Sequence, residues 1–232
     1  MTPIILHIET STFEGSIALS QGNKLLREVV LPSGEKYVKT LASSIDILLQ
    51  DADVSRDQLE AIAISSGPGS YTGLRIGASL CKGLAHGLNI PLIVVPTLEI
   101  LARAVFEKYA PDLAIPLMDA RRMEVYTAAY QRDLNIALPT TALVIDENSF
   151  EDFLGKRCVF AGNGSEKCRQ LLEAKPEFVV DGEIALAARF MVDSAVKAFK
   201  LKEFESVESF EPFYLKEFQI GKSSKISTIL KG

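Results

Sequence analysis

A glycine-rich loop is the segment of this sequence best suited to bind an anion. Gly67-Pro68-Gly69-Ser70, called here the glycine loop, follows an apolar run, and Ser70 or Thr72 could cap the helix that comes next. Backbone N–H groups at such a helix start form a natural anion site. A phosphate loop, however, would continue with Lys and then Ser or Thr, whereas Gly73 is followed by Leu and Arg. The loop therefore predicts a turn and a helix start, with intrinsic nucleotide binding as the lesser alternative.

Two acidic residues, Glu9 and Asp119, each end an apolar strand-like run. If they lie across a cleft, paired carboxylates could organise Mg²⁺ for an ATP- or acyl-phosphate-binding enzyme. The residues after Glu9 contain no glycine hairpin that would wrap phosphates, and Gly162-Asn163-Gly164 is short for a segment that clasps adenosine. Asp119 could equally form a surface ion pair with Arg121 or Arg122. We therefore expect no cofactor and no metal site, and keep the enzyme as an alternative.

A nucleophile with a neighbouring base is not evident in the sequence. Ser70 stands outside any Gly-x-Ser-x-Gly elbow, and the two histidines, His7 and His86, form no His-x-x-x-His pair. His7 alternates with apolar neighbours, which is typical of a structural histidine. A glycoprotease-like peptidase that uses Ser70 is thus the weaker alternative. The cysteines are widely spaced without a Cys-x-x-Cys pair, which indicates buried thiols in a reducing compartment: Cys81, Cys158 and Cys168.

An alternation of strands and helices must position these residues, and it occurs twice. The first half is predicted to hold strands at 4–8, 16–19, 25–31, 59–65 and 91–95 and helices at 35–50, 70–87 and 98–108. The second half is predicted to hold strands at 113–118, 125–130, 142–145 and 157–161 and helices at 149–154, 165–173 and 183–200. Glu9 and Asp119 occupy corresponding corners of the two halves.

This repetition predicts a duplicated α/β fold, with two related lobes that face a cleft. We expect the lobes at 1–108 and 109–217, followed by a basic tail at 218–232. The closing helix at 183–200 could pack back on the first lobe.

The predicted helix at 70–87 carries unusually small side chains. Gly73, Gly77, Cys81 and Ala85 recur every four residues, so one of its faces is almost bare. Each helical glycine costs about 1 kcal/mol relative to alanine. A close approach of another element could offset this cost, and that element could belong to the same lobe or to a second protein.

Charge is unevenly distributed along the 232 residues. The net charge is −5, yet the segment from Lys216 to Gly232 holds four Lys and one Glu, or +3, which leaves −8 for residues 1–215. An acidic body binds polyanions poorly, because nucleic-acid affinity depends largely on Lys and Arg at phosphates. No apolar run approaches the roughly 20 residues of a membrane span, and the first residues lack the pattern of a secretion signal. We expect a cytoplasmic protein.

The segment Ser65-Ser66-Gly67-Pro68-Gly69-Ser70-Tyr71-Thr72-Gly73-Leu74-Arg75-Ile76-Gly77 resembles the signature of the TsaB (YeaZ) family. Three other segments resemble the family in the same order: Ile8–Ser11, Leu117–Tyr126 and Glu211–Lys216. The likeness extends over about residues 4–216. Glu9 stands where the family usually has Asp, Lys216 where Arg is usual, and residues 33–36 lack a His often found there. These departures affect details at the corner and the helix end.

The resemblance implies an actin/Hsp70/sugar-kinase fold of duplicated RNase H-like lobes. It also implies a non-catalytic subunit that pairs with TsaD, which transfers threonylcarbamoyl to adenosine 37 of tRNA, and works with the ATPase TsaE. The chain would then meet tRNA only indirectly. The family pairs through its first two helices, and an isolated chain could form a homodimer through them. The residues expected in or beside the interface are Tyr37, Leu41, Ile45, Gly73, Leu74, Gly77 and Cys81.

Overall fold

A five-stranded mixed sheet forms the core of the first lobe. The computed structural model describes residues 2–31 and 35–215, with the side chains of the first helix described from Thr40 onward. The strands lie in the order β3-β2-β1-β4-β5. Their bounds are β1 Ile4–Glu9, β2 Ser16–Gln21, β3 Lys24–Val30, β4 Ala61–Ser65 and β5 Leu92–Val95. β1 pairs antiparallel with β2 and parallel with β4. Every residue of β4 is buried, as expected of a strand in a sheet covered on both faces.

The second lobe repeats this topology. Its sheet has the order β10-β9-β6-β7-β8, and β6 pairs antiparallel with β7 and parallel with β9. The strands are β6 Leu113–Asp119, β7 Glu124–Tyr130, β8 Ile136–Val144, β9 Cys158–Ala161 and β10 Phe178–Asp181. Each strand corresponds to the one five positions earlier in the chain, so the second sheet has the strand order of the first. The fold is thus the predicted duplicated α/β architecture, of the RNase H-like, actin/Hsp70/sugar-kinase type.

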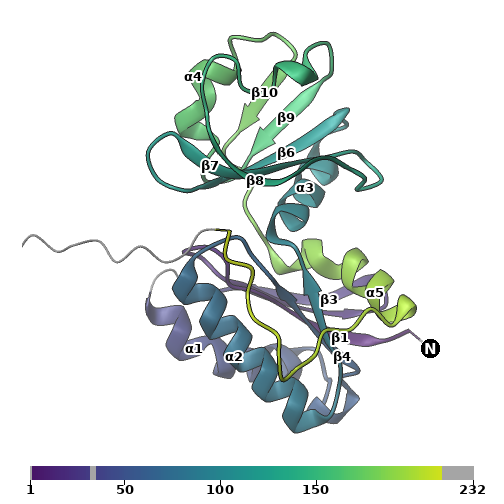
Figure 1. Cartoon of the computed structure of the whole chain (residues 1–232). Coiled ribbons are helices and arrows are strands. Elements are labelled where there is room, and N and C mark those ends of the chain that lie inside the picture. Colours follow the sequence, from purple (N-terminus) through teal and green to yellow (C-terminus); the bar gives the residue numbers. More distant parts are fainter. Residues whose placement is uncertain (1, 32–34, 216–232) are drawn as a thin grey trace, which may run out of the picture.

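Two helices are exchanged between the lobes, so that each packs on the sheet of the other half of the chain. α1 (Glu35–Asp51) and α2 (Tyr71–Leu88) cover one face of the first sheet, and α5 (Val192–Leu201) with the short helix Ala188–Met191 covers the other. α3 (Thr97–Lys108) comes from the first half of the chain but packs on the second sheet (Figure 1). One core cluster therefore contains side chains of both sheets, including Ile5 and Val159. The lobe boundary predicted at 108/109 therefore falls between α3 and the second sheet, on which α3 packs.

Four predicted elements differ from the structure. The strand predicted at 142–145 is the end of a longer strand, β8 Ile136–Val144. The closing helix spans 188–201 instead of 183–200, because 183–187 forms the connection from the second lobe back to the first. The predicted helix at 165–173 is a short helix Glu166–Cys168 followed by α4 (Arg169–Leu172), and that at 149–154 shortens to Glu151–Phe153. β10 was not predicted. Another short helix lies at Arg56–Gln58, and no helix in the described ranges is long and apolar enough to cross a membrane.

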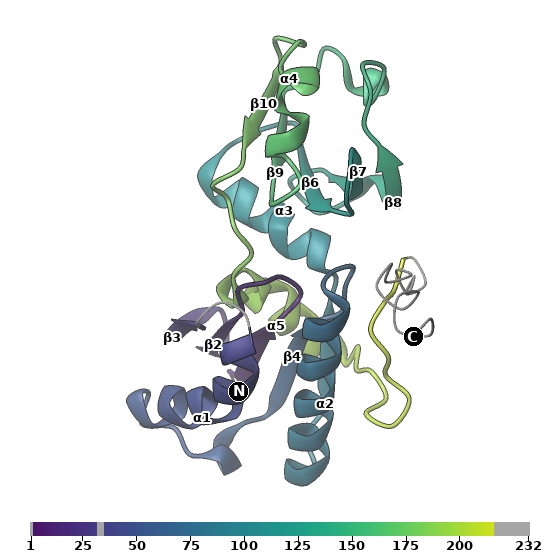
Figure 2. The same ribbon diagram turned by 90° about the vertical axis from the view of Figure 1, so that its left-hand side faces the viewer.

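The last described residues form a strap, defined here as residues 203–215, along α2 (Figure 2). Glu205 makes an isolated antiparallel bridge with Leu92 of β5. Phe210 is buried in the core beneath α1 and α2, and Lys82 Nζ of α2 donates to the carbonyl oxygens of Glu208 and Phe210 at 2.9 and 3.1 Å. The strap thereby brings residues 213–215 to the region between the lobes. Lys216 and the basic tail at 218–232 lie outside the described residues.

Candidate functional site

The predicted corners and the glycine loop meet at a cleft between the lobes. The cleft has a volume of about 500 Å³ and is lined from both lobes and from the strap. We call it the front cleft. The first lobe contributes residues 11–13 and 68–71, the second contributes 118–121, Glu124, Tyr126 and Asn163, and the strap contributes 213–215. Sequence elements that are more than 100 residues apart therefore form one surface.

Glu9 lies beneath this cleft as a fully buried carboxyl group. Its Oε1 accepts hydrogen bonds from the Ser11 N–H at 2.7 Å and from the Ser11 hydroxyl. Burial raises the pKa of Glu9, and the bonds from Ser11 oppose that rise in part. The corner therefore stabilises the protonated acid instead of presenting an open carboxylate.

Asp119 is half-exposed and already paired. Lys167 Nζ bridges its Oδ1 and the Glu124 carbonyl oxygen, the latter at 2.8 Å. The same Oδ1 accepts the N–H of Arg121 at 3.1 Å, and Asn163 Oδ1 accepts the N–H of Asp119 at 2.9 Å. The expected ion pair exists, but with Lys167 in place of Arg121 or Arg122.

These contacts give the two corners different chemistry. Glu9 is enclosed and Asp119 is neutralised, so the acidic pair expected across the cleft is not a pair of open carboxylates. Among residues 2–31 and 35–215, no group of three or more His, Cys, Asp and Glu could hold a metal ion. His7 is fully buried, its Nε2 lies 2.8 Å from Ser20 Oγ, and burial lowers its pKa to about 3.

The glycine loop is held tightly against its neighbours. A Cβ on Gly67 would lie 2.5 Å from the carbonyl oxygen of Phe213, and one on Gly69 would lie 2.5 Å from that of Ser11. The Ser70 N–H donates to the Ser11 carbonyl at 2.6 Å, and Ser70 Oγ caps α2 by accepting the Gly73 N–H at 3.3 Å. The loop includes a cis bond before Pro68. Its glycines permit close packing, and the N–H groups of Gly67 and Ser70 already have protein acceptors.

The small-residue stripe of α2 faces the sheet of its own lobe. A Cβ on Gly77 would lie 2.2 Å from Thr10 Oγ1 and 3.3 Å from Ile64 Cδ1. The predicted interface residues on these helices are buried within that lobe: Leu41, Ile45, Gly73, Leu74, Gly77 and Cys81. All six residues pack against the first sheet in this chain, and their place in or beside a partner interface stays a prediction. Tyr37 lies outside the described side chains. Pairing through the two helices stays a prediction for their outer faces.

Sequence reasoning missed the outer face of α2. Leu80, Leu84 and Leu88 are partly buried and line a narrow groove with α1, while Gly83 and Gly87 beside them are exposed. Nothing lies within 4 Å of a Cβ placed on either glycine. The leucine repeat was visible in the sequence, but four-residue spacing alone could not separate the inner stripe from this one.

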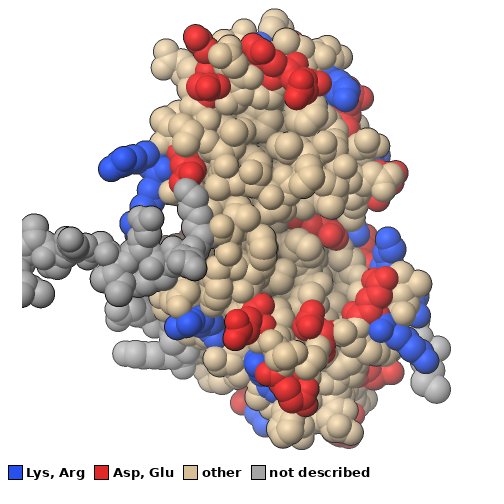
Figure 3. All heavy atoms as spheres, in the orientation of Figure 1, with Lys and Arg blue, Asp and Glu red and all other residues tan. Residues whose placement is uncertain are grey.

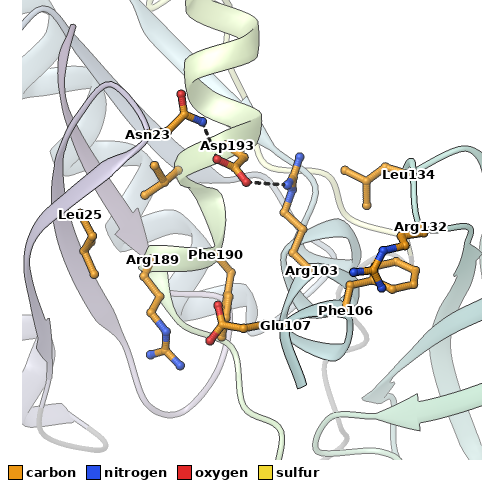
Figure 4. Close-up of a pocket in the computed structure, with 11 residues that line it drawn as sticks. Asn23, Leu25, Arg103, Phe106, Glu107, Arg132, Leu134, Arg189, Phe190 and Asp193 are labelled. Atoms are coloured by element: carbon orange, nitrogen blue, oxygen red, sulfur yellow. Dashed lines mark hydrogen bonds and ion pairs between the residues drawn. The ribbon is translucent and has the colours of Figure 1, made fainter. Parts of the chain in front are cut away.

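A second cavity, of about 420 Å³, lies beside α3 and α5 (Figure 4). Three of its charged groups are already paired: Asp193 accepts from Asn23 at 2.5 Å and lies 3.4 Å from Arg103, and Arg189 lies 2.9 Å from Glu28. It contains none of the site residues expected from the sequence. We therefore regard the front cleft as the better candidate site.

Comparison with known proteins decides the family. A family model described as TsaD: tRNA N6-adenosine threonylcarbamoyltransferase matches residues 30–202. The protein named tRNA threonylcarbamoyladenosine biosynthesis protein TsaB from Bacillus subtilis is 31% identical, with 91% of this chain and 93% of that protein covered. The TsaB from Escherichia coli is 34% identical over 91% and 94% of the two chains. The chain belongs to the TsaB family.

A solved structure agrees with this assignment. YeaZ from Pseudomonas aeruginosa superposes with a TM-score of 0.80 at 25% identity, and covers 92% of this chain and 100% of its own. A second structure, from the same organism, is described as an uncharacterized protein with similarity to peptidase YEAZ; it has a TM-score of 0.80 and 26% identity. The TsaB resemblance inferred from the Gly-Pro-Gly segment is thus confirmed.

Proposed function

We propose that this TsaB-family chain is a non-catalytic subunit of the complex that forms threonylcarbamoyladenosine at position 37 of tRNA. It would act by pairing with and activating a TsaD-type catalytic subunit, with a TsaE-type ATPase as a further partner. The names of its relatives support the pathway. The buried Glu9 and the ion-paired Asp119 agree with a supporting role.

The outer face of α2 carries the pairing part of this proposal. Gly83 is exposed in the helix interior, where a glycine costs about 1 kcal/mol relative to alanine, and Gly87 is exposed in the last turn. They lie beside Leu80 and Leu84 at helical spacing, and no side chain of the described chain covers them. Bare backbone next to half-buried leucines permits a close approach by a partner helix, which would offset the cost of the glycines.

Charge supports the division of labour. The described body carries the acidic excess, and acidic side chains lie on both lobes on the face shown in Figure 3. Most of the tRNA phosphates would therefore be held by the partner subunit. In the absence of that partner, the same outer face of α1 and α2 would pair two copies of this chain.

Reconstitution of threonylcarbamoyladenosine synthesis, with and without this chain, tests the function. Synthesis should depend on the chain, and the chain should co-elute with the TsaD-type subunit. Gly83→Leu should weaken this pairing at least tenfold, since the added side chain occupies the approach surface. Gly83→Ala is the control for helix propensity, and Ala137→Leu on exposed β8 is the control for added apolar surface.

Two outcomes would contradict the proposal. Wild-type pairing by Gly83→Leu would remove the outer face of α2 from the interface. Micromolar ATP binding by the purified chain in calorimetry, lost in Glu9→Ala or Asp119→Ala, would favour the actin-fold enzyme instead.

A further inference from the structure

The rim of the front cleft gathers exposed aromatic side chains from three separate segments. Phe13, in the loop between β1 and β2, is 71% exposed, and Phe213 of the strap is 47% exposed. Tyr71 at the start of α2 packs against Tyr214 of the strap, with 4.9 Å between the ring centroids. All four residues line the cleft. We call them the aromatic rim. Exposed phenylalanines are costly in water, so two of them beside one cleft indicate a surface that receives an apolar or aromatic ligand.

Guanidinium groups lie beside these rings. Arg75 Cζ lies 4.2 Å from the centroid of the Tyr71 ring, and Arg121 lines the cleft from the opposite lobe. Arg122 is its exposed neighbour. No acidic side chain within the described ranges forms an ion pair with any of the three. The cleft's own Asp119 is neutralised by Lys167. Three guanidinium groups therefore lie at or beside the rim without an ion pair in the described ranges, in a cleft that Glu124 also lines.

Two of the arginines lie in a backbone turn of unusual conformation. Arg121 and Arg122 have φ values of +74° and +50° in the tight turn between β6 and β7. Hydrogen bonds across the turn hold this shape: Ala120 N–H to Glu124 O and Glu124 N–H to Arg121 O, both at 3.1 Å. Each left-handed non-glycine residue costs of order 1–2 kcal/mol, and such conformations concentrate at functional sites. The turn holds Arg121, which lines the cleft, next to the exposed Arg122.

Aromatic rings with interleaved arginines are the surface that single-stranded nucleic acid requires. Unstacked bases stack on aromatic side chains and on guanidinium planes, while a paired helix hides its bases from both. We propose that the aromatic rim, with Arg75, Arg121 and Arg122, binds unstacked bases of a single-stranded RNA loop. This inference rests on the proposed function, in which the partner holds most of the tRNA, and it adds a direct contact by this chain to an exposed loop.

The arginines and the aromatic rings set the expected salt dependence and affinity of RNA binding. With three arginines at phosphates, the slope of log K against log salt should be about −2, since each phosphate contact on a single strand contributes roughly −0.7. Each stacked base should contribute a factor of about 5 to 150 in affinity, equivalent to roughly 1–3 kcal/mol.

Fluorescence anisotropy with the full chain tests the proposal. The probe is a labelled RNA hairpin of 17 nucleotides with a seven-nucleotide loop, compared with a blunt RNA duplex of equal length and with AMP. We expect the hairpin to bind at least ten times more tightly than the duplex. Phe13→Ala and Arg121→Glu should each weaken hairpin binding at least fivefold. Phe204→Ala and Arg132→Glu are matched exposed controls outside the rim and should leave it unchanged.

Three results would overturn the proposal. Equal affinity for hairpin and duplex would assign RNA contact to charge alone, and rim variants that bind as the wild type does would remove the rim from the contact. Binding of AMP without preference for the hairpin would make the occupant a free nucleotide. Co-elution of the same variants with the TsaD-type subunit separates RNA binding by the rim from the proposed pairing, because rim variants should keep that pairing. If the wild-type chain does not pair with that subunit, the proposed function is refuted, and RNA binding by the rim is then judged from the hairpin measurement alone.

Discussion

Two glycines of α2 provide a matched test of which face of that helix packs on the protein. Gly77 faces the first sheet, where an added Cβ would lie 2.2 Å from Thr10 Oγ1 and 3.3 Å from Ile64 Cδ1. Gly83, six residues later, has nothing within 4 Å of the corresponding position. Both lie inside the helix, so replacement by alanine gives each the same gain in helix propensity, about 1 kcal/mol. Only the packing differs.

The difference in unfolding free energy between Gly77→Ala and Gly83→Ala therefore isolates the packing cost. Overpacking of a filled core costs about 1–3 kcal/mol. For a chain of this size, 1 kcal/mol corresponds to about 2–4 °C in Tm. Gly83→Ala should raise Tm by about 2–4 °C, and Gly77→Ala should melt several degrees below it. Calorimetry and urea unfolding measure both variants.

Equal stabilisation by the two substitutions would refute the orientation of α2. A double-mutant cycle sharpens the result: Thr10→Ala should relieve part of the Gly77→Ala cost, with a coupling of about 0.5–3 kcal/mol. Thr10 Oγ1 has no hydrogen-bond partner among the described residues, so its removal breaks no bond there. Zero coupling would show that the added methyl group meets a different neighbour.

Four further substitutions test contacts described above. The raised pKa of Glu9 stabilises the folded protein below its usual pKa of 4.5, and this contribution falls as pH rises; Glu9→Gln should therefore flatten the decline of Tm above pH 4.5. The lowered pKa of His7 acts in the opposite sense, so stability should fall from pH 6.5 toward pH 3, and His7→Gln should reduce that fall. Lys167→Met removes the bridge to Asp119 and should lower the unfolding free energy by about 1 kcal/mol in urea titrations. Lys82→Met should free the strap, which limited proteolysis would detect as faster cleavage within 203–215.

The sequence predicted most elements because their patterns are local. Local sequence patterns specify the conformation of the run Ile4–Ile8, of the cap at Ser70 and of the glycine loop. The repeated order of elements predicted the second lobe from the first. β10 was missed because its four residues, Phe178–Asp181, are too few to show a period. Residues 183–187 have good helix propensity, but the chain must cross there between the lobes, and the Ala188 N–H bonds to Ser16 Oγ of the first sheet.

The candidate site was only partly predictable, for a different physical reason. Periodicity identified Gly77 as a point of close approach, but it could not say that Thr10 lies on the other side. Similarly, Glu9 and Asp119 occupy the predicted corners, whereas the burial of one and the pairing of the other with Lys167 depend on chain segments far away in sequence. The aromatic rim joins three such segments, so no single stretch of sequence contains it.

The exchanged helices have a consequence for how this molecule comes apart. A fragment that ends after α3 would carry a helix without the sheet that it covers, and its own sheet would lack the α5 layer. The remaining fragment would carry α5 without the first sheet, and its own sheet would lack α3. Neither piece could shield its apolar surface alone. The two lobes, although copies of one plan, should therefore unfold together in a single cooperative step, and co-expressed halves should regain a compact state only by assembling with each other.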